Sequence, residues 1–334
     1  TFGIVAQAVV LFFFWRRAGL RFRPDFRWRR VGLAATGRAA GWLFGMVLVT
    51  QIAGVVQTRV VSFASGDGAS ISTFQNSWLI FMLPHSVIAV SIATAYFTRI
   101  SGHAARGDTA GVRHDVSASL RAIGLLLVFS AVALAVVVYP FARIFESDFP
   151  KVLAMGNVIL AFLVGLVPFG AFFIVQRTFY ALGQTRTTFF LQCLQTVVFI
   201  GVALWCMLLP SEWIAAGVAG ATTIAGLAHA LTGALLLRKR LGASGGGLVS
   251  VRYLQFLGLS ILSGAAGAGL LVLLGGFSAS GFAQSGRAQA IVAMACVGVF
   301  MVLIYGGLLA LVRNPEFAAF TQPIVRRLRR RRME

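Results

Sequence analysis

The sequence predicts an all-α, polytopic membrane protein, and three observations support this fold class. Of the 334 residues, 58% are hydrophobic and only 11% are charged. The mean hydropathy is +0.87. Soluble domains carry about 25% charged residues, so this chain has too few charges to cover a surface that faces water. The third observation is that the apolar residues gather in runs of about 20, the length with which a helix crosses a bilayer.

Nine apolar runs divide the chain. We predict membrane segments at 1–15, 39–63, 72–97, 120–143, 152–176, 188–210, 213–237, 253–276 and 287–312. The first segment is short because the chain begins with Thr1 inside an apolar run, and we expect its helix to start further upstream.

The connections between these segments alternate in charge. Arg and Lys concentrate in 16–38, 98–121, 177–187, 238–252 and 313–334, whereas the intervening loops hold Asp67, Glu146, Asp148 and Glu212. Cytoplasmic loops are enriched in Lys and Arg. The alternation therefore places every basic connection, and the C-terminal tail, in the cytoplasm.

The composition of three cytoplasmic connections also predicts their local structure. The arginines and aromatic residues of 16–38, and the spaced apolar residues of 99–121, are typical of segments that lie on an anionic leaflet, the second as a short interfacial helix. The Gly- and Ser-rich stretch 241–248 predicts a flexible linker.

The net charge of +20 does not indicate a nucleic-acid-binding protein. Its cations occur in short clusters between apolar runs, whereas nucleic-acid binding needs a continuous basic face. The three cysteines, Cys193, Cys206 and Cys296, lie apart within apolar segments, so we expect buried small residues rather than a metal site or a disulfide. No catalytic, cofactor or metal-binding pattern is present in the sequence, and an enzyme is not predicted.

Polar residues inside the apolar segments are the candidates for a transport path, because such residues tend to face a bundle interior or a wet cavity. The candidates are Gln57, Arg59, Gln75, Asn76 and His85. Arg59 has two interpretations: it extends to the membrane surface, or it lines a cavity and meets an anionic substrate. His85 is either a packing residue that forms hydrogen bonds or a proton carrier.

Prolines and glutamines mark further positions within the predicted helices. Pro84 and Pro168 predict kinks, and transporters use kinked or broken helices where their repeats move against each other. Gln192 and Gln195 lie three residues apart and share a helix face, which predicts hydrogen bonds between helices.

Three stretches resemble motifs of one transporter family. They are LPHSVIAVSIATAYFTRIS with HAARGD (83–108), QRTFYALGQTRT (176–187) and GLRFRPDFRW (19–28). They resemble MurJ-type (MviN) lipid II flippases of the multidrug/oligosaccharidyl-lipid/polysaccharide transporter superfamily. The resemblance covers about residues 1–237, and the high content of Ala, Val and Arg is typical of an actinobacterial relative.

The resemblance implies a fold of fourteen helices, with two six-helix lobes followed by a final pair that forms a lipid-binding groove. This chain would then be the C-terminal portion. Residues 1–15 would end a helix of the first lobe, 16–38 would be a basic connection, and 39–237 the second lobe. A linker (238–252), the final pair (253–312) and a basic tail (313–334) would follow.

The activity implied is export of the undecaprenyl-linked peptidoglycan precursor, lipid II, across the bacterial plasma membrane by alternating access. Implied partners are the lipid-linked precursor, anionic lipids at the basic loops, and cell-wall synthesis proteins. Two alternatives stay open. One is a transporter of another polyprenyl-linked glycan or a small molecule, and the other is a membrane scaffold for cell-wall assembly that transports nothing.

The chain departs from the family pattern at several positions. Leu79 stands where many members have Arg, and Thr98 replaces a proline. Some members bind sodium through an Asp whose position falls near Thr58 here, together with Asn or Asp in the segment that matches 188–210, which has neither. We therefore expect no sodium site of that type, and Arg59 is the candidate to supply the missing cavity charge.

Overall fold

The computed structural model describes the chain except for residues 1, 18–32, 65–69, 243–245 and 321–334. It divides into two compact units, Thr1–Gly41 and Trp42–Glu334. The first unit holds α1 (Phe2–Arg17) and the start of α2 (Leu33–Val61). Most of the predicted leaflet-bound segment 16–38 lies outside the described residues, so that prediction stays a prediction.

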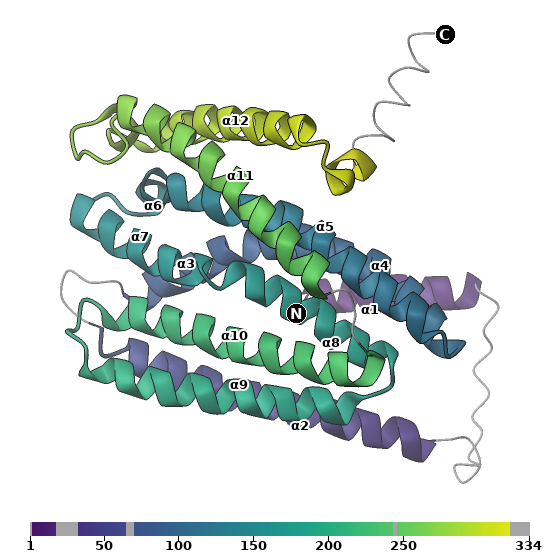
Figure 1. Cartoon of the computed structure of the whole chain (residues 1–334). Coiled ribbons are helices and arrows are strands. Elements are labelled where there is room, and N and C mark those ends of the chain that lie inside the picture. Colours follow the sequence, from purple (N-terminus) through teal and green to yellow (C-terminus); the bar gives the residue numbers. More distant parts are fainter. Residues whose placement is uncertain (1, 18–32, 65–69, 243–245, 321–334) are drawn as a thin grey trace. The chain divides into compact units, whose positions relative to one another are not determined.

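The second unit is a helical bundle that contains the rest of α2 (Figure 1). Its longer helices are α3 (Ile71–Pro84), α4 (Val90–Ala105), α5 (Thr109–Val136), α6 (Val138–Phe145), α7 (Phe149–Leu163), α8 (Leu166–Ala181), α9 (Thr185–Trp205), α10 (Ile214–Leu241), α11 (Gly246–Leu273) and α12 (Arg287–Leu311). Short helical turns are η2 (His85–Ala89), η3 (Cys206–Leu208) and η4 (Phe282–Gln284). Across the described ranges, seven helices are long and apolar enough to span a membrane, and the bent pair α7–α8 makes an eighth. The predicted all-α membrane fold is confirmed.

Several helices extend beyond the predicted apolar segments, and two predictions differ from the structure. No separate interfacial helix occupies 99–121, because α4 continues to Ala105 and α5 begins at Thr109. The segment predicted at 120–143 is instead α5, which ends at Val136, followed by α6. Hydropathy marks only the part of a helix that lipid surrounds, whereas Ala and Arg favour helix in water as well.

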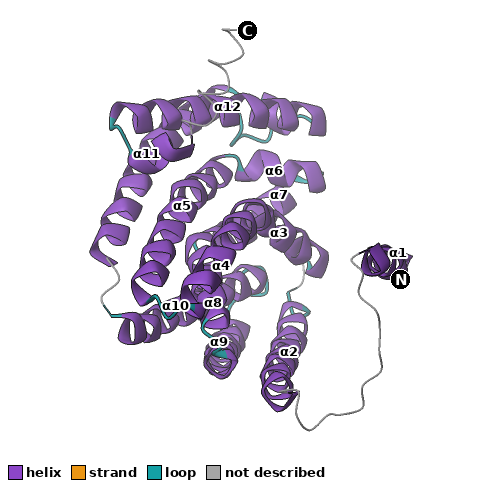
Figure 2. Cartoon of the chain, turned by 90° about the vertical axis from the view of Figure 1, so that its right-hand side faces the viewer, coloured by secondary structure: helices purple, strands orange, loops and turns teal. Residues whose placement is uncertain are grey.

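The core joins α3 to α7 and α8 through aromatic rings. Phe162 contacts Phe74, Trp78 and Phe81, with ring centroids 5.2 to 5.5 Å apart. The pair α11–α12 is fixed to α5, which α11 crosses (Figures 1 and 2). The hydroxyl of Tyr253 donates to the carbonyl of Leu120 at 2.9 Å, and Tyr305 donates in the same way to Leu125 at 2.8 Å. These bonds satisfy polar groups that lipid cannot solvate.

Both prolines lie next to irregular helical backbone. Pro84 ends α3, and η2, a single π-helical stretch, connects it to α4. The predicted kink in 152–176 is present as a 40° bend, but it lies between Leu163 and Leu166 rather than at Pro168. Pro168 stands in the first turn of α8, where a missing N–H breaks no helical bond.

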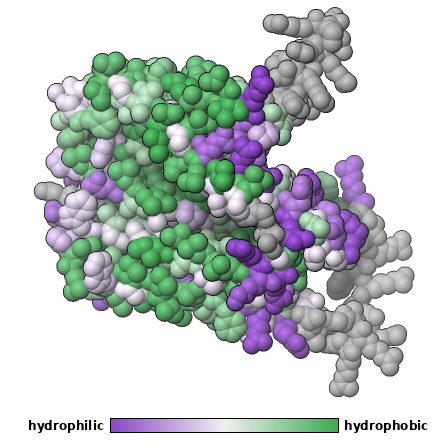
Figure 3. Space-filling view, viewed as in Figure 1, coloured by the Kyte–Doolittle hydropathy of each residue, from purple (hydrophilic) through white to green (hydrophobic). Residues whose placement is uncertain are grey.

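The visible face of the molecule is mostly apolar, and polar side chains gather toward one edge (Figure 3). Lipid solvates such a face, so apolar side chains can lie on it. The prediction that all three cysteines are buried is therefore wrong. Cys206 is buried as expected, but Cys193 is half-buried and Cys296 is exposed. An apolar side chain in a membrane has no need to reach the protein interior.

Candidate functional site

The two strongest sequence motifs form the same kind of turn between antiparallel helices. In HAARGD, the N–H of Asp108 donates to the carbonyl of His103 and that of Gly107 to Ala104, at 3.0 and 3.1 Å. In FYALGQTRT, Gln184 and Gly183 repeat the pattern with Phe179 and Tyr180. Both glycines have a φ near +70°, which glycine adopts at little cost. Each motif thus ends one helix, and the next helix starts directly after it.

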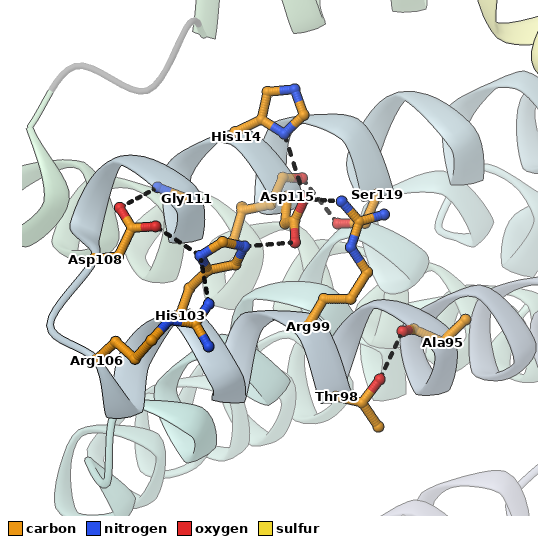
Figure 4. Close-up of polar contacts among 11 residues, drawn as sticks. Ala95, Thr98, Arg99, His103, Arg106, Asp108, Gly111, His114, Asp115 and Ser119 are labelled. Atoms are coloured by element: carbon orange, nitrogen blue, oxygen red, sulfur yellow. Dashed lines mark hydrogen bonds and ion pairs between the residues drawn. The ribbon is translucent and has the colours of Figure 1, made fainter.

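A cluster of charged side chains holds the first of these turns, the α4–α5 hairpin, together (Figure 4). At its centre is Asp115 on α5, whose side chain is 1% exposed. Arg99 on α4 donates to it at 2.7 Å, and rings of His114 and His103 lie 3.3 and 3.7 Å away. A buried carboxylate requires such partners, so Asp115 fixes the ends of α4 and α5 to each other.

Asp108 links this cluster to the start of α5. Its carboxylate accepts the backbone N–H of Gly111 at 2.8 Å and lies 2.6 Å from Nδ1 of His103. The N–H of Gly111 and the contact with His103 hold the pKa of Asp108 below its usual value. Gly111 leaves room for both side chains, because an added Cβ would overlap them and displace them from this arrangement.

We predict that acidification loosens the first turn of α5. The folded-state pKa of Asp108 is depressed, so its ionised form stabilises the turn above the usual pKa, and this contribution is lost as the pH falls through the lowered pKa. Hydrogen exchange at Gly111, corrected for intrinsic rates, measures the effect. In Asp108→Asn this dependence on pH is expected to vanish, and an unchanged profile in that variant would contradict the assignment.

A pocket of about 390 Å³, called the glutamine-lined pocket below, lies among α2, α3, α8, α9 and α10. Its polar lining consists of amides and hydroxyls, together with an indole, and its other walls are phenylalanine rings and small residues. The polar residues are Thr50, Gln51, Gln57, Trp78, Gln192, Gln195, Thr196 and Thr222. No charged side chain is among the described residues that line it.

One predicted candidate, Gln57, lines this pocket, and the structure does not bring the other four to it. Arg59 and Gln75 are exposed, and Asn76 is partly exposed. His85 is buried, with its ring centroid 4.5 Å from that of Phe169 and 5.2 Å from that of Phe173. These contacts agree with packing against aromatic rings, but Nδ1 of His85 has no hydrogen-bond partner among the described residues, so the hydrogen bonding expected of His85 is not seen at this atom.

The predicted interhelical role of the glutamines on α9 is met by Gln195, whose Oε1 lies 2.8 Å from Nδ1 of buried His229 on α10. Thr196 on the same wall is 6% exposed, and its hydroxyl has no hydrogen-bond partner among the described residues. The pocket therefore offers neutral donors and acceptors beside aromatic rings, a lining suited to an uncharged polar group. Thr196 and Thr222 were not predicted.

A family model described as "Lipid II flippase MurJ" matches residues 1–304. The chain belongs to the MurJ lipid II flippase family. The resemblance read from the three sequence motifs is therefore confirmed, and the match also includes most of the final helix pair, α11 and α12.

Two MurJ proteins illustrate the relationship. The "Probable lipid II flippase MurJ" of Borreliella burgdorferi is 22% identical over 214 residues, which are 61% of this chain and 41% of that protein. A solved structure titled "Lipid II flippase MurJ, inward closed conformation" matches with a TM-score of 0.61 at 19% identity, covering 97% of this chain and 62% of that one. The fold is shared, and the chain spans about half the length of these MurJ proteins.

Proposed function

We propose that this chain is the C-terminal portion of a lipid II flippase, and that the whole protein moves the undecaprenyl-linked peptidoglycan precursor to the outer leaflet. The observation that carries the proposal is the MurJ family match over residues 1–304. In this arrangement α2–α10 form the second lobe and α11–α12 the final pair. Residues 16–38 connect the second lobe to the first.

Charge supports an orientation in the bacterial plasma membrane. The α4–α5 hairpin, the α8–α9 turn and the end of α10 carry the basic side chains, among them Arg106, Arg186, Arg238 and Lys239. By the positive-inside rule these ends and the C-terminal tail face the cytoplasm. The basic ends would contact anionic lipids, and cell-wall synthesis proteins are further candidate partners.

The glutamine-lined pocket and the irregular helices would supply parts of a transport mechanism. Neutral amides such as Gln57 and Gln192 would hydrogen-bond the uncharged sugar and peptide groups of the precursor. The bend at Gly165 and the π-helical turn η2 would let helix segments tilt as the lobes alternate. Arg59, Gln75 and Asn76 remain proposed cavity residues of the whole protein.

Complementation tests the activity. The full-length gene is expressed in a bacterium depleted of its own lipid II flippase, and growth with normal shape is expected to return. Failure to rescue despite normal membrane expression would argue for another lipid-linked substrate or a scaffold role. Rescue that is lost only on deleting the basic tail would favour the scaffold.

A further inference from the structure

A second pocket, of about 590 Å³, lies between α4, α5 and the residues that follow α12. Its wall is mainly apolar and includes Ile92, Ala95, Ala122 and Phe320. Arg121 and Glu316 supply charge at the same pocket. It is distinct from the glutamine-lined pocket, whose walls are formed by α2, α3, α8, α9 and α10.

The charged network that begins in this second pocket and continues to Arg252 outside its lining holds more positive than negative charge. Arg121 on α5 donates through Nε to Glu316 at 2.8 Å and through Nη1 to Ser117 at 2.7 Å. Arg252 on α11 lies on the other side of Glu316, with its Nε 3.7 Å from Oε2. Two guanidinium groups thus share one carboxylate, which leaves one positive charge uncompensated within the network.

A second observation is that Arg252 and Glu316 are too far apart to share a hydrogen bond, with Nε and Oε2 separated by 3.7 Å. Both Nε of Arg252 and Oε2 of Glu316 are buried, and neither has a hydrogen-bond partner among the described residues. The three charged side chains are only 14% to 24% exposed. Buried polar atoms are normally paired, so the Nε donor of Arg252 points to an additional acceptor at this site. Within the described part of the chain, the carboxylate of Glu316 accepts a hydrogen bond through Oε1 alone.

Helix lengths place this site at the boundary between lipid and water. The span Ile71–Ala105 has 35 residues, about 52 Å of helix at 1.5 Å per residue, against a hydrocarbon core of about 30 Å. A span that enters the core near Ile71 leaves it about 20 residues later, at the level of Ile92. Arg252 near the start of α11 and Glu316 just after α12 agree with this level.

We propose that Arg121 and Arg252 form a binding site for the phosphate of an anionic glycerophospholipid, with Glu316 as the group that the phosphate displaces. Guanidinium groups bind phosphate through two parallel hydrogen bonds. An acyl chain of the same lipid lies along the apolar wall beside Ile92 and Ala95. The site is a feature of the folded bundle and does not depend on which lipid-linked substrate the whole protein moves.

Native mass spectrometry of the full-length protein tests the site, with phosphatidylglycerol as the probe and phosphatidylcholine as the neutral comparison. The double variant Arg121→Gln, Arg252→Gln is expected to bind phosphatidylglycerol at least roughly tenfold more weakly than the wild type. The matched control removes the same charge from exposed positions at the starts of α7 and α12, as Lys151→Gln, Arg287→Gln, and is expected to keep the wild-type affinity.

A second variant, with the opposite expected effect on phosphatidylglycerol affinity, keeps the test decisive if the double variant does not fold. Glu316→Gln removes the competing carboxylate and is expected to raise the affinity for phosphatidylglycerol. Unchanged or weaker binding in Glu316→Gln would overturn the proposal, as would equal binding of the two lipids. Preferential displacement of phosphatidylglycerol by undecaprenyl phosphate would also overturn it, because the site would then belong to a polyprenyl substrate.

Discussion

Replacing Asp115 by Asn is expected to lower the free energy of unfolding by about 2 kcal/mol, the size of a lost hydrogen bond to a buried charged group. The variant keeps the shape of the side chain but removes the carboxylate that Arg99 contacts at 2.7 Å. His114 lies near the same oxygen as Arg99 and His103 near the other, and an amide offers only one oxygen. The exposed half of Arg99 remains in water, which limits the loss.

Thermal unfolding of the purified protein in detergent measures this loss, and hydrogen exchange locates it at the ends of α4 and α5. The matched control is Asp148→Asn at the start of α7, because Asp148 also forms an ion pair, with Lys151 at 3.0 Å, but is 61% exposed. Exposed pairs contribute little, so this control is expected to melt close to the wild type. Equal melting of the two variants would show that burial of Asp115 contributes nothing.

The fold was largely predictable because lipid imposes a simple rule on the sequence. Every segment that crosses the bilayer must be helical and apolar over about 20 residues, and the predicted segments fall on the observed helices. The errors arose where that rule ends. The charged stretch 99–121 carries no hydropathy signal, and its helical state depends on the caps at Gly107 and Asp108.

The candidate sites were less predictable because they join residues that are distant in sequence. Arg121 and Glu316 are 195 positions apart, and each looks like an ordinary charge at the end of an apolar run. Gln57 was found because a polar residue within an apolar helix is conspicuous. Thr196 was not, since threonines in membrane helices usually bond to their own backbone, as Thr178 does here.

The largest loss of stability is expected at the connection between α11 and α12, in the variant Gly281→Ala. A Cβ at Gly281 would overlap the carbonyl oxygen of Gly275 and lie 2.6 Å from its Cα. These are backbone atoms, so no side chain can rotate away, and the loop itself has to move. The N–H of Ala283 donates to Leu274 at 3.0 Å and the amide of Gln284 to Gly276 at 2.9 Å, and both bonds depend on this close approach.

We expect Gly281→Ala to cost about 3 kcal/mol, measured as a lower melting temperature in detergent. The control is Gly269→Ala in α11, where an added Cβ meets nothing within 4 Å. Ala favours helix over Gly, so the control is expected to melt at or slightly above the wild-type temperature. If both variants have the same melting temperature, the backbone segments around Gly275 and Gly281 do not approach as closely as they do here. If only Gly281→Ala is destabilised, close backbone packing in this loop holds α11 against α12 and keeps the final helix pair in place on α5.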